Sequence, residues 1–165
     1  MNDNYAVING KKIELTGEQI EALGFEARKP LFKRLKSNAS NCYYYINEFG
    51  DVTFGYESGI SGNDKKYNNV NYFNDENFAR QVALHQLLYR KLLKYAYENK
   101  CKDVEWNTEH MHWSIYYNMD IDKFDIDASS TYKHQEVYFS TSLGAKRAIE
   151  EVIKPFIKEH PDFVW

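Results

Sequence analysis

Four aspartates stand close together in the run MDIDKFDID and could hold a divalent metal ion. They are Asp120, Asp122, Asp125 and Asp127. Carboxylates gathered in this way bind Mg²⁺ in metal-dependent nucleases. The spacing differs from that of an EF-hand loop, because it has no glycine at the turn position and no closing glutamate. We therefore expect these acids to form the solvated tip and outer face of a β-hairpin, and we predict no metal site.

A second candidate for chemistry is the pair His110 and His112, with Glu109 beside it. In a strand the two imidazoles would share a face, but no third ligand is identifiable, and two histidines alone make a weak metal site. His85 lies in the apolar stripe of a predicted helix, where we expect a packing role. The sequence also lacks a P-loop, a dinucleotide fingerprint and a nucleophile elbow. We therefore predict no catalytic residue and no cofactor, and a protein that is not an enzyme.

The composition favours a single folded domain that works in the cytoplasm. The 165 residues include 14 tyrosines and 10 phenylalanines, and their net charge of -3 gives no general attraction to nucleic acid or an anionic membrane. Cys42 and Cys101 lie far apart, so we expect two free thiols in a reducing compartment. No signal peptide and no apolar run of about 20 residues is evident, which predicts a protein without a membrane partner.

Residues 1–24 predict a β-hairpin followed by a short helix. Asn9 and Gly10 separate two alternating runs and favour a type I′ turn. Thr16 and Gln19 have the spacing of a helix capping box.

Residues 25–41 form a basic connector, which we expect to be partly helical after Pro30. Five cations in it are candidate contacts for phosphate or nucleic acid: Arg28, Lys29, Lys33, Arg34 and Lys36.

Residues 42–165 are predicted to contain one structural unit twice, although any strand that runs into a capped helix has a similar pattern. NYFNDENFA (71–79) matches VYFSTSLGA (137–145), and each run follows a pair of alternating strands and leads into a helix. We define repeat one as residues 42–100 and repeat two as residues 103–160. The predicted fold class is α+β. In it, two β-hairpin-strand-helix repeats form one mixed or antiparallel sheet packed by two helices, with a small N-terminal hairpin-helix appendage.

The two helices are expected at about residues 75–99 and 141–159. Asn74 is the predicted cap of the first, and Pro155 should kink or break the second. Residues 58–71, which are polar and contain glycine, are predicted to be a loop.

Alternation along the strands sorts the side chains onto two faces. If Phe73 and Phe139 point toward the helices that follow them, Tyr72 and Tyr138 point the other way. The inner face predicted in this way is Tyr44, Ile46, Val52, Phe54, Tyr56, Trp113, Ile115, Tyr117, Phe124, Ile126 and Val137. The outer face carries Tyr43, Tyr45, Thr53, Tyr72, Ser114, Tyr116, Asp125, Asp127 and Tyr138.

The outer face would be a tyrosine platform with an acidic margin. Either another part of the chain or a second subunit covers it, or it binds a partner, because rigid tyrosine rings are favoured in recognition surfaces. We predict partner binding by this platform, with the tyrosines of the outer face and the four aspartates as contacts: Tyr43, Tyr45, Tyr72, Tyr116, Tyr138, Asp120, Asp122, Asp125 and Asp127.

The chain resembles a group of small accessory proteins encoded by phages and prophages of Gram-positive bacteria. The resemblance follows nearly the whole chain, through NGKKIELTGEQIEALG, a basic linker, YYYINEFGDV, NYFNDENFARQVA, VEWN, HWSIYYN and VYFSTSLGAKRAIEEV. These motifs are structural, so the resemblance implies no catalytic residue. It implies an anti-defence context, in which such proteins bind a host factor such as a CRISPR effector.

We therefore expect a phage-encoded, non-enzymatic inhibitor that binds and blocks a bacterial immune factor in the host cytoplasm. The partner would be a host protein or a protein-RNA complex, and a homodimer is compatible with the sequence. Two alternatives stay open. One is a sponge that sequesters a nucleotide signal through residues 28–36 or through Arg80 and Lys146. The other is a nucleic-acid-binding accessory protein that combines tyrosine stacking with the basic connector. A metal-dependent hydrolase is the remaining, weakest hypothesis.

Overall fold

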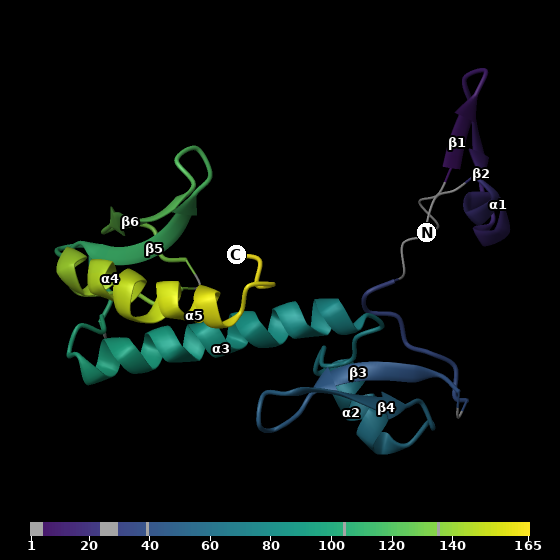
Figure 1. Ribbon diagram of the computed structural model, residues 1–165, viewed down its shortest axis with the longest axis horizontal. Helices are drawn as coiled ribbons and strands as arrows, with labels where there is room; N and C mark the ends of the chain where they lie inside the picture. Colours follow the sequence, from purple (N-terminus) through teal and green to yellow (C-terminus); the bar gives the residue numbers. More distant parts are fainter. Residues whose placement is uncertain (1–4, 24–29, 39, 104, 135) are drawn as a thin grey trace.

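The chain folds into three small antiparallel sheets and a set of helices (Figure 1). This computed structural model describes residues 5–23, 30–38, 40–103, 105–134 and 136–165. The elements in chain order are β1 (Tyr5–Ile8), β2 (Lys11–Glu14), α1 (Gly17–Ala22), β3 (Cys42–Ile46), β4 (Val52–Tyr56), α2 (Ser61–Asn68), α3 (Glu76–Glu98), β5 (His112–Asn118), β6 (Lys123–Ser129), α4 (Ser142–Ala148), the π-helical turn η1 (Ile149–Ile153) and α5 (Lys154–Glu159). The predicted α+β class is confirmed.

The predicted single sheet is wrong for the described residues. Strands pair only within hairpins, as β1 with β2, β3 with β4, and β5 with β6. In place of the third strand expected in each repeat, a single residue forms a β-bridge to the hairpin. Phe73 pairs with Tyr44 in repeat one, and Phe139 pairs with Trp113 in repeat two. Each bridge consists of two backbone hydrogen bonds of 2.8 to 3.0 Å. The two bridges align the repeats, so that Tyr44 corresponds to Trp113.

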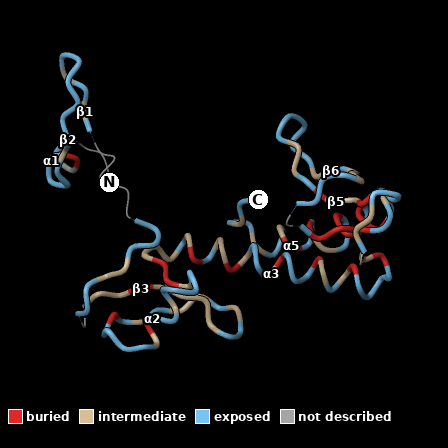
Figure 2. The backbone as a smooth tube through the Cα atoms, turned by 180° about the vertical axis from the view of Figure 1, so that it is seen from behind, coloured by how far each residue is buried: buried red, intermediate tan, exposed pale blue. Residues whose placement is uncertain are grey.

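The N-terminal hairpin and helix form as predicted. Asn9 and Gly10 have φ angles of 51° and 77°, as a type I′ turn requires. The Thr16 backbone N–H donates to Gln19 Oε1 at 2.8 Å, and the Gln19 N–H donates to Thr16 Oγ1 at 3.3 Å, which completes the capping box. In Figure 1 this unit lies apart from the two repeats, and Figure 2 shows that most of it is exposed.

The connector is not helical after Pro30. The described residues 30–38 contain no helix. The Asn74 N–H donates to the Leu31 carbonyl at 3.0 Å, and in repeat two the Ser140 N–H donates to the Cys101 carbonyl at 2.9 Å. Leu31 therefore takes the place in repeat one that Cys101 takes in repeat two.

The long predicted helix is confirmed, with a cap one residue later than expected. Asp75 accepts a hydrogen bond from the Phe78 N–H at 2.8 Å, and Thr141 caps α4 by accepting from the Gly144 N–H at 3.1 Å. The second helix continues through Pro155 without a break. The helix widens to a π turn just before this residue, which lies at the start of α5.

The core lies where α3 packs against the helical run of α4, η1 and α5. In Figure 1 the two run side by side in opposite directions, with the hairpin of β5 and β6 over α4. The fully buried members include Ala96, Phe139, Ala145, Ala148, Ile153 and Phe156. Cys42 and Cys101 are free thiols, as predicted. Within the described ranges, no helix is both long and apolar enough to cross a membrane.

Close packing at Gly144 provides a first prediction. A Cβ atom there would lie 2.9 Å from the Cβ of buried Cys101. Gly144→Ala should therefore lower the free energy of unfolding by about 1 kcal/mol in urea titrations, because overpacking outweighs the gain in helix propensity. The control is Gly62→Ala in α2, where the nearest atom, Ile60 Cδ1, would lie 4.0 Å from the new Cβ and stability should rise or stay unchanged. Equal gains in both variants would contradict this account of the packing.

Candidate protein-binding surface

Two of the three tyrosines predicted to form an exposed platform in repeat one are buried, and the third, Tyr45, is half-buried. Tyr43 and Tyr72 are each 1% exposed, and their rings stack at 4.0 Å between centroids. Their cover is α2, which forms within the segment predicted to be a loop. The Lys66 ammonium of this helix lies 4.1 Å from the centre of the Tyr45 ring. The outer face of β3 and β4 is therefore an internal contact rather than a surface for a partner.

Polar contacts hold α2 in place where an apolar stripe is lacking. Asn63 is 3% exposed, accepts from the Tyr43 hydroxyl at 3.0 Å and donates to the Tyr56 carbonyl at 3.2 Å. Asp64, one residue later, forms an ion pair of 2.8 Å with Arg34 from the connector.

Glu57 is the centre of this polar network and is 1% exposed. It accepts from Arg34 Nε at 2.7 Å, from the Tyr72 hydroxyl at 3.1 Å and from the Gly59 N–H at 2.9 Å. The Arg34 hydrogen bond is the main reason why the pKa of Glu57 falls to about 2, with further help from Asn63, and burial opposes the fall.

Arg34 is therefore paired with two acids of the protein while its side chain is still 31% exposed, and its role as a phosphate contact stays a prediction. The side chains of Lys33 and Lys36 are exposed and stay candidates. Arg28 and Lys29 lie outside the described residues.

His112 occupies the position in repeat two that Tyr43 has in repeat one. It is 1% exposed and stacks on Trp106 at 3.8 Å. Its Nδ1 contacts the Asp103 carboxylate, and its Nε2 lies 2.7 Å from the Asn107 carbonyl oxygen. Both ring nitrogens are thus engaged, so the pair with His110, which is exposed, offers no site for a metal. The described residues hold no group of three or more side chains placed to bind one.

Tyr138 is also buried, contrary to prediction. It is 4% exposed, its ring meets Trp106 edge to face, and its hydroxyl accepts from the His134 N–H at 2.6 Å. Tyr43, Tyr72 and Tyr138, three of the five tyrosines predicted for the platform, are buried for the same reason. Residues from outside the strands pack over them in both repeats.

The inner face of repeat one is less covered than predicted. Phe54 and Tyr56 are 58% and 53% exposed. Both lie on β4, which is the outer strand of its hairpin because Phe73 pairs with β3. The following helix α3 therefore reaches this strand only in part.

The outer face of β5 and β6 has no cover equivalent to α2. Between β6 and Val137, residues 130–134 and 136 contain no helix. Cross-strand pairs place Ser114 beside Asp127 and Tyr116 beside Asp125 on this face. Tyr116 and Asp127 are exposed, whereas Ser114 and Asp125 are half-buried. These four residues, which we call the acidic face, are the part of the predicted platform that stays accessible.

The two remaining aspartates lie at the tip of the same hairpin. Asp120 and Asp122 are exposed, and the Tyr117 hydroxyl donates to the Asp122 carboxylate. This agrees with the prediction that they form a solvated hairpin tip.

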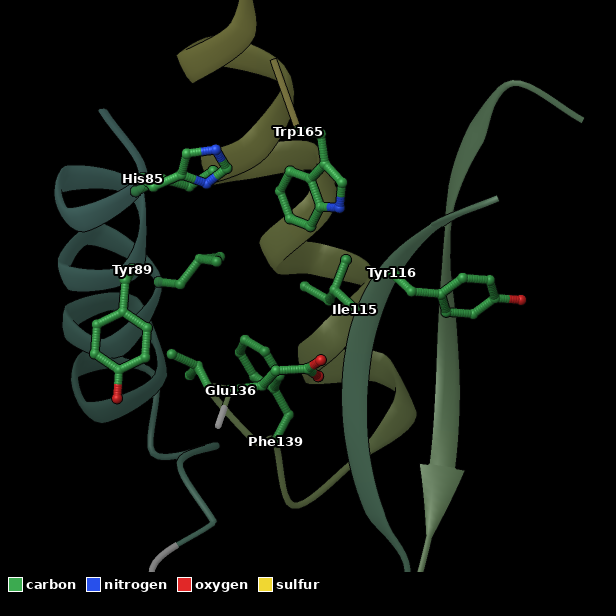
Figure 3. A pocket seen from close by; sticks show the side chains of 10 residues that line it. His85, Tyr89, Ile115, Tyr116, Glu136, Phe139 and Trp165 are labelled. Carbon is green, nitrogen blue, oxygen red and sulfur yellow. The ribbon is translucent and has the colours of Figure 1, made fainter. Parts of the chain in front are cut away.

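A cavity of about 310 Å³ opens beside the acidic face, between α3, β5 and the C-terminal tail (Figure 3). Buried apolar side chains form its floor: Leu88, Leu92, Ile115, Val137 and Phe139. His85, Tyr89, Tyr116, Glu136 and Trp165 form its exposed rim. Sequence reasoning missed Glu136 and Trp165, because nothing in their local pattern distinguishes them from ordinary surface residues.

The rim includes His85, which the sequence placed in a packed stripe. It is exposed, with its ring 4.8 Å from that of Phe163. Comparison of this chain with protein-family models, with curated proteins and with solved structures finds no match.

Proposed function

We propose that the chain is a binding protein rather than an enzyme, and that its acidic face holds a basic segment of a partner protein. The observation that carries the proposal is the difference between the repeats. In repeat one α2 covers the outer face of the hairpin, whereas in repeat two Trp106 covers only the His112 end of this face and leaves Tyr116 and Asp127 exposed.

Repeat one indicates what kind of partner would fit. There, Lys66 of α2 lies over Tyr45, which pairs with Thr53 across the hairpin. The corresponding pair in repeat two is Ser114 and Asp127. A lysine approaching in the same way would meet the Asp127 carboxylate, with Asp125 beside it. Complementary charge of this kind favours a basic partner and disfavours an acidic one.

Titration with synthetic peptides tests the proposal. The probe is a helical peptide of about four turns with lysines along one face, followed by fluorescence anisotropy, and its counterpart carries glutamates instead. We expect salt-sensitive binding of the lysine peptide only. The double variant Asp125→Lys with Asp127→Lys should weaken it about tenfold or more, because attraction becomes repulsion.

The matched control reverses the same number of charges on the other hairpin. Glu48→Lys with Asp51→Lys changes exposed acids at the turn of β3 and β4 and should leave binding unchanged. Equal weakening by both double variants would show a general charge effect and would contradict a site on the acidic face. Binding of nucleotides or single-stranded DNA in place of the lysine peptide would favour the two alternative functions.

Steric block of a bacterial immune factor is the use that we propose for this face. The identity of that target rests on the resemblance to phage accessory proteins and stays a prediction. It implies stoichiometric inhibition without turnover when the purified protein is added to a CRISPR effector.

A further inference from the structure

One hydrogen-bonding position differs between the repeats. In repeat one, the side-chain amide of Asn71 accepts from the Ile46 N–H and donates to the Ile46 carbonyl, both at 2.8 Å. Asn71 thus continues the pairing that begins at the bridge between Tyr44 and Phe73. The equivalent residues in repeat two are Ile115 and Val137, and valine has no amide to offer.

The peptide groups of Ile115 consequently face the cavity. Trp113 directs its N–H and C=O to Phe139, away from β6. In an antiparallel pair this direction alternates, so Ile115, two residues further on, points its own groups to the same side. Beyond the bridge the two segments diverge, and among the described residues these groups of Ile115 have no hydrogen-bond partner.

The cavity at this position has one acidic group in apolar surroundings. Figure 3 shows the Glu136 carboxylate in the space between α3 and β5, near Ile115 and Phe139, whereas the Tyr116 ring points away from it. Leu88, Leu92 and Phe139 line the floor. The described lining includes no lysine or arginine that could pair with Glu136.

We propose that this cavity binds an extended, basic peptide segment of the partner protein. One peptide group of the segment pairs with the N–H and C=O of Ile115, as the Asn71 amide does with Ile46. An apolar side chain of the segment fills the cavity, and a neighbouring lysine or arginine meets Glu136. The volume of about 310 Å³ lies at the lower end of the range for ligand sites, which suits one or two side chains better than a large cofactor.

This inference rests on the proposed function, because it assigns a second contact to the same basic partner. Tyr116 points its ring to the acidic face but directly follows Ile115 on β5, so a segment that pairs with Ile115 can touch both. Pairing with a free strand edge is a common mode of peptide recognition, in which backbone bonds give affinity and side-chain pockets give specificity.

The decisive variant is Val137→Asn, which would give repeat two the amide of repeat one. The probe is a capped hexapeptide of alternating lysine and leucine, followed by calorimetry. Because the new amide would occupy the groups of Ile115, we expect affinity for the hexapeptide to fall about tenfold or more. The control is Val70→Asn, which introduces the same amide at an exposed valine of repeat one, outside the cavity, and should retain binding within about threefold.

Two measurements need no change at Val137 and cover the case in which that variant fails to fold. A hexapeptide methylated at its backbone nitrogens cannot donate to Ile115 and should bind wild-type protein about tenfold more weakly or not at all. Glu136→Gln, which changes an exposed side chain, should weaken the unmodified hexapeptide and reduce the salt dependence of binding.

The outcomes separate this inference from the proposed function. Full binding of the methylated hexapeptide, or unchanged affinity in Val137→Asn, would overturn pairing at Ile115. If the helical lysine peptide still depends on Asp125 and Asp127 in that case, the proposed function stands alone. If the helical peptide does not bind but the hexapeptide does, the acidic face is wrong and the cavity is the binding site.

Discussion

Replacement of Arg34 by methionine is expected to lower the free energy of unfolding by several times the loss that removal of an exposed cation of the connector causes. The change leaves Glu57 buried at 1% exposure without the cation that binds it through two nitrogens. An unpaired buried charge destabilises the folded state by more than the ion pair stabilises it. The reason is that the charge stays out of contact with water but no longer has a partner that offsets its lost hydration. Methionine retains part of the aliphatic stem, so the loss reports mainly on the charge.

Urea titration followed by circular dichroism measures this effect. Lys36→Met is the control, because Lys36 is an exposed cation of the same connector and its loss should change stability by less than about 0.5 kcal/mol. Similar small losses in both variants would mean that Arg34 contributes no more than a surface charge.

The same ion pair determines how stability responds to acid. The ordinary pKa of Glu57 is 4.5, and in the folded protein it is about 2. A lowered pKa stabilises the folded state at pH values above 4.5, and this stabilisation is lost as the pH falls toward 2. Because Arg34 is the main cause of the shift, Arg34→Met should show a shallower loss of stability over this interval than the wild type.

Replacement of His112 by phenylalanine is the second change with a large expected effect. Phenylalanine can keep the stacking on Trp106, but it leaves the Asp103 carboxylate and the Asn107 carbonyl without their donors. We expect a loss of about 2 kcal/mol, because unpaired polar groups in a buried site keep their desolvation cost. His110→Phe, at an exposed position, should change stability by less than about 0.5 kcal/mol.

His112 also gives stability the opposite dependence on pH. Burial alone would lower the pKa of His112, but the hydrogen bonds to the Asn107 carbonyl and the Asp103 carboxylate outweigh it and raise the pKa above 6.5. A raised pKa stabilises the folded state fully below pH 6.5, and the contribution is lost as the pH rises through the higher value. The melting temperature of the wild type should therefore fall above pH 6.5, whereas that of His112→Phe should not show this fall. A wild-type curve as flat as that of the variant would contradict a charged His112.

The elements that could be predicted from the sequence are those specified by local signals. Asn9-Gly10 fixes a turn by its positive φ angles, and Thr16 with Gln19 fixes a helix start. The strands 112–118 and 123–129 follow from alternation, and α3 follows from its apolar stripe. Each signal lies within a few residues of the structure that it specifies.

Burial of the tyrosines could not be predicted in the same way. Alternation shows that Tyr72 and Phe73 lie on opposite faces, but it does not show what covers each face. In repeat one α2 covers these tyrosines, and its sequence is polar. Asn63 and Asp64 hold this helix in place through contacts with residues that are distant in the sequence.

The candidate site was predicted only in part. Tyr116, Asp125 and Asp127 were chosen from the strand pattern and do lie on an accessible face. The cavity beside them needs Glu136, α3 and Trp165, which come together only through the packing of distant segments. The difference between Asn71 and Val137 is visible in the sequence, but its meaning depends on knowing that each faces an isoleucine peptide group.

The chain has three tryptophans, Trp106, Trp113 and Trp165, and all follow α3. Intrinsic fluorescence therefore reports on the second half of the molecule, while circular dichroism reports on both repeats. A protonated His112 stacked on Trp106 should quench emission, so the imidazole can be titrated optically. Trp165 borders the cavity, which makes its emission a label-free signal for an incoming peptide. Disagreement between the fluorescence and dichroism transitions would reveal that one copy of the duplicated unit melts before the other.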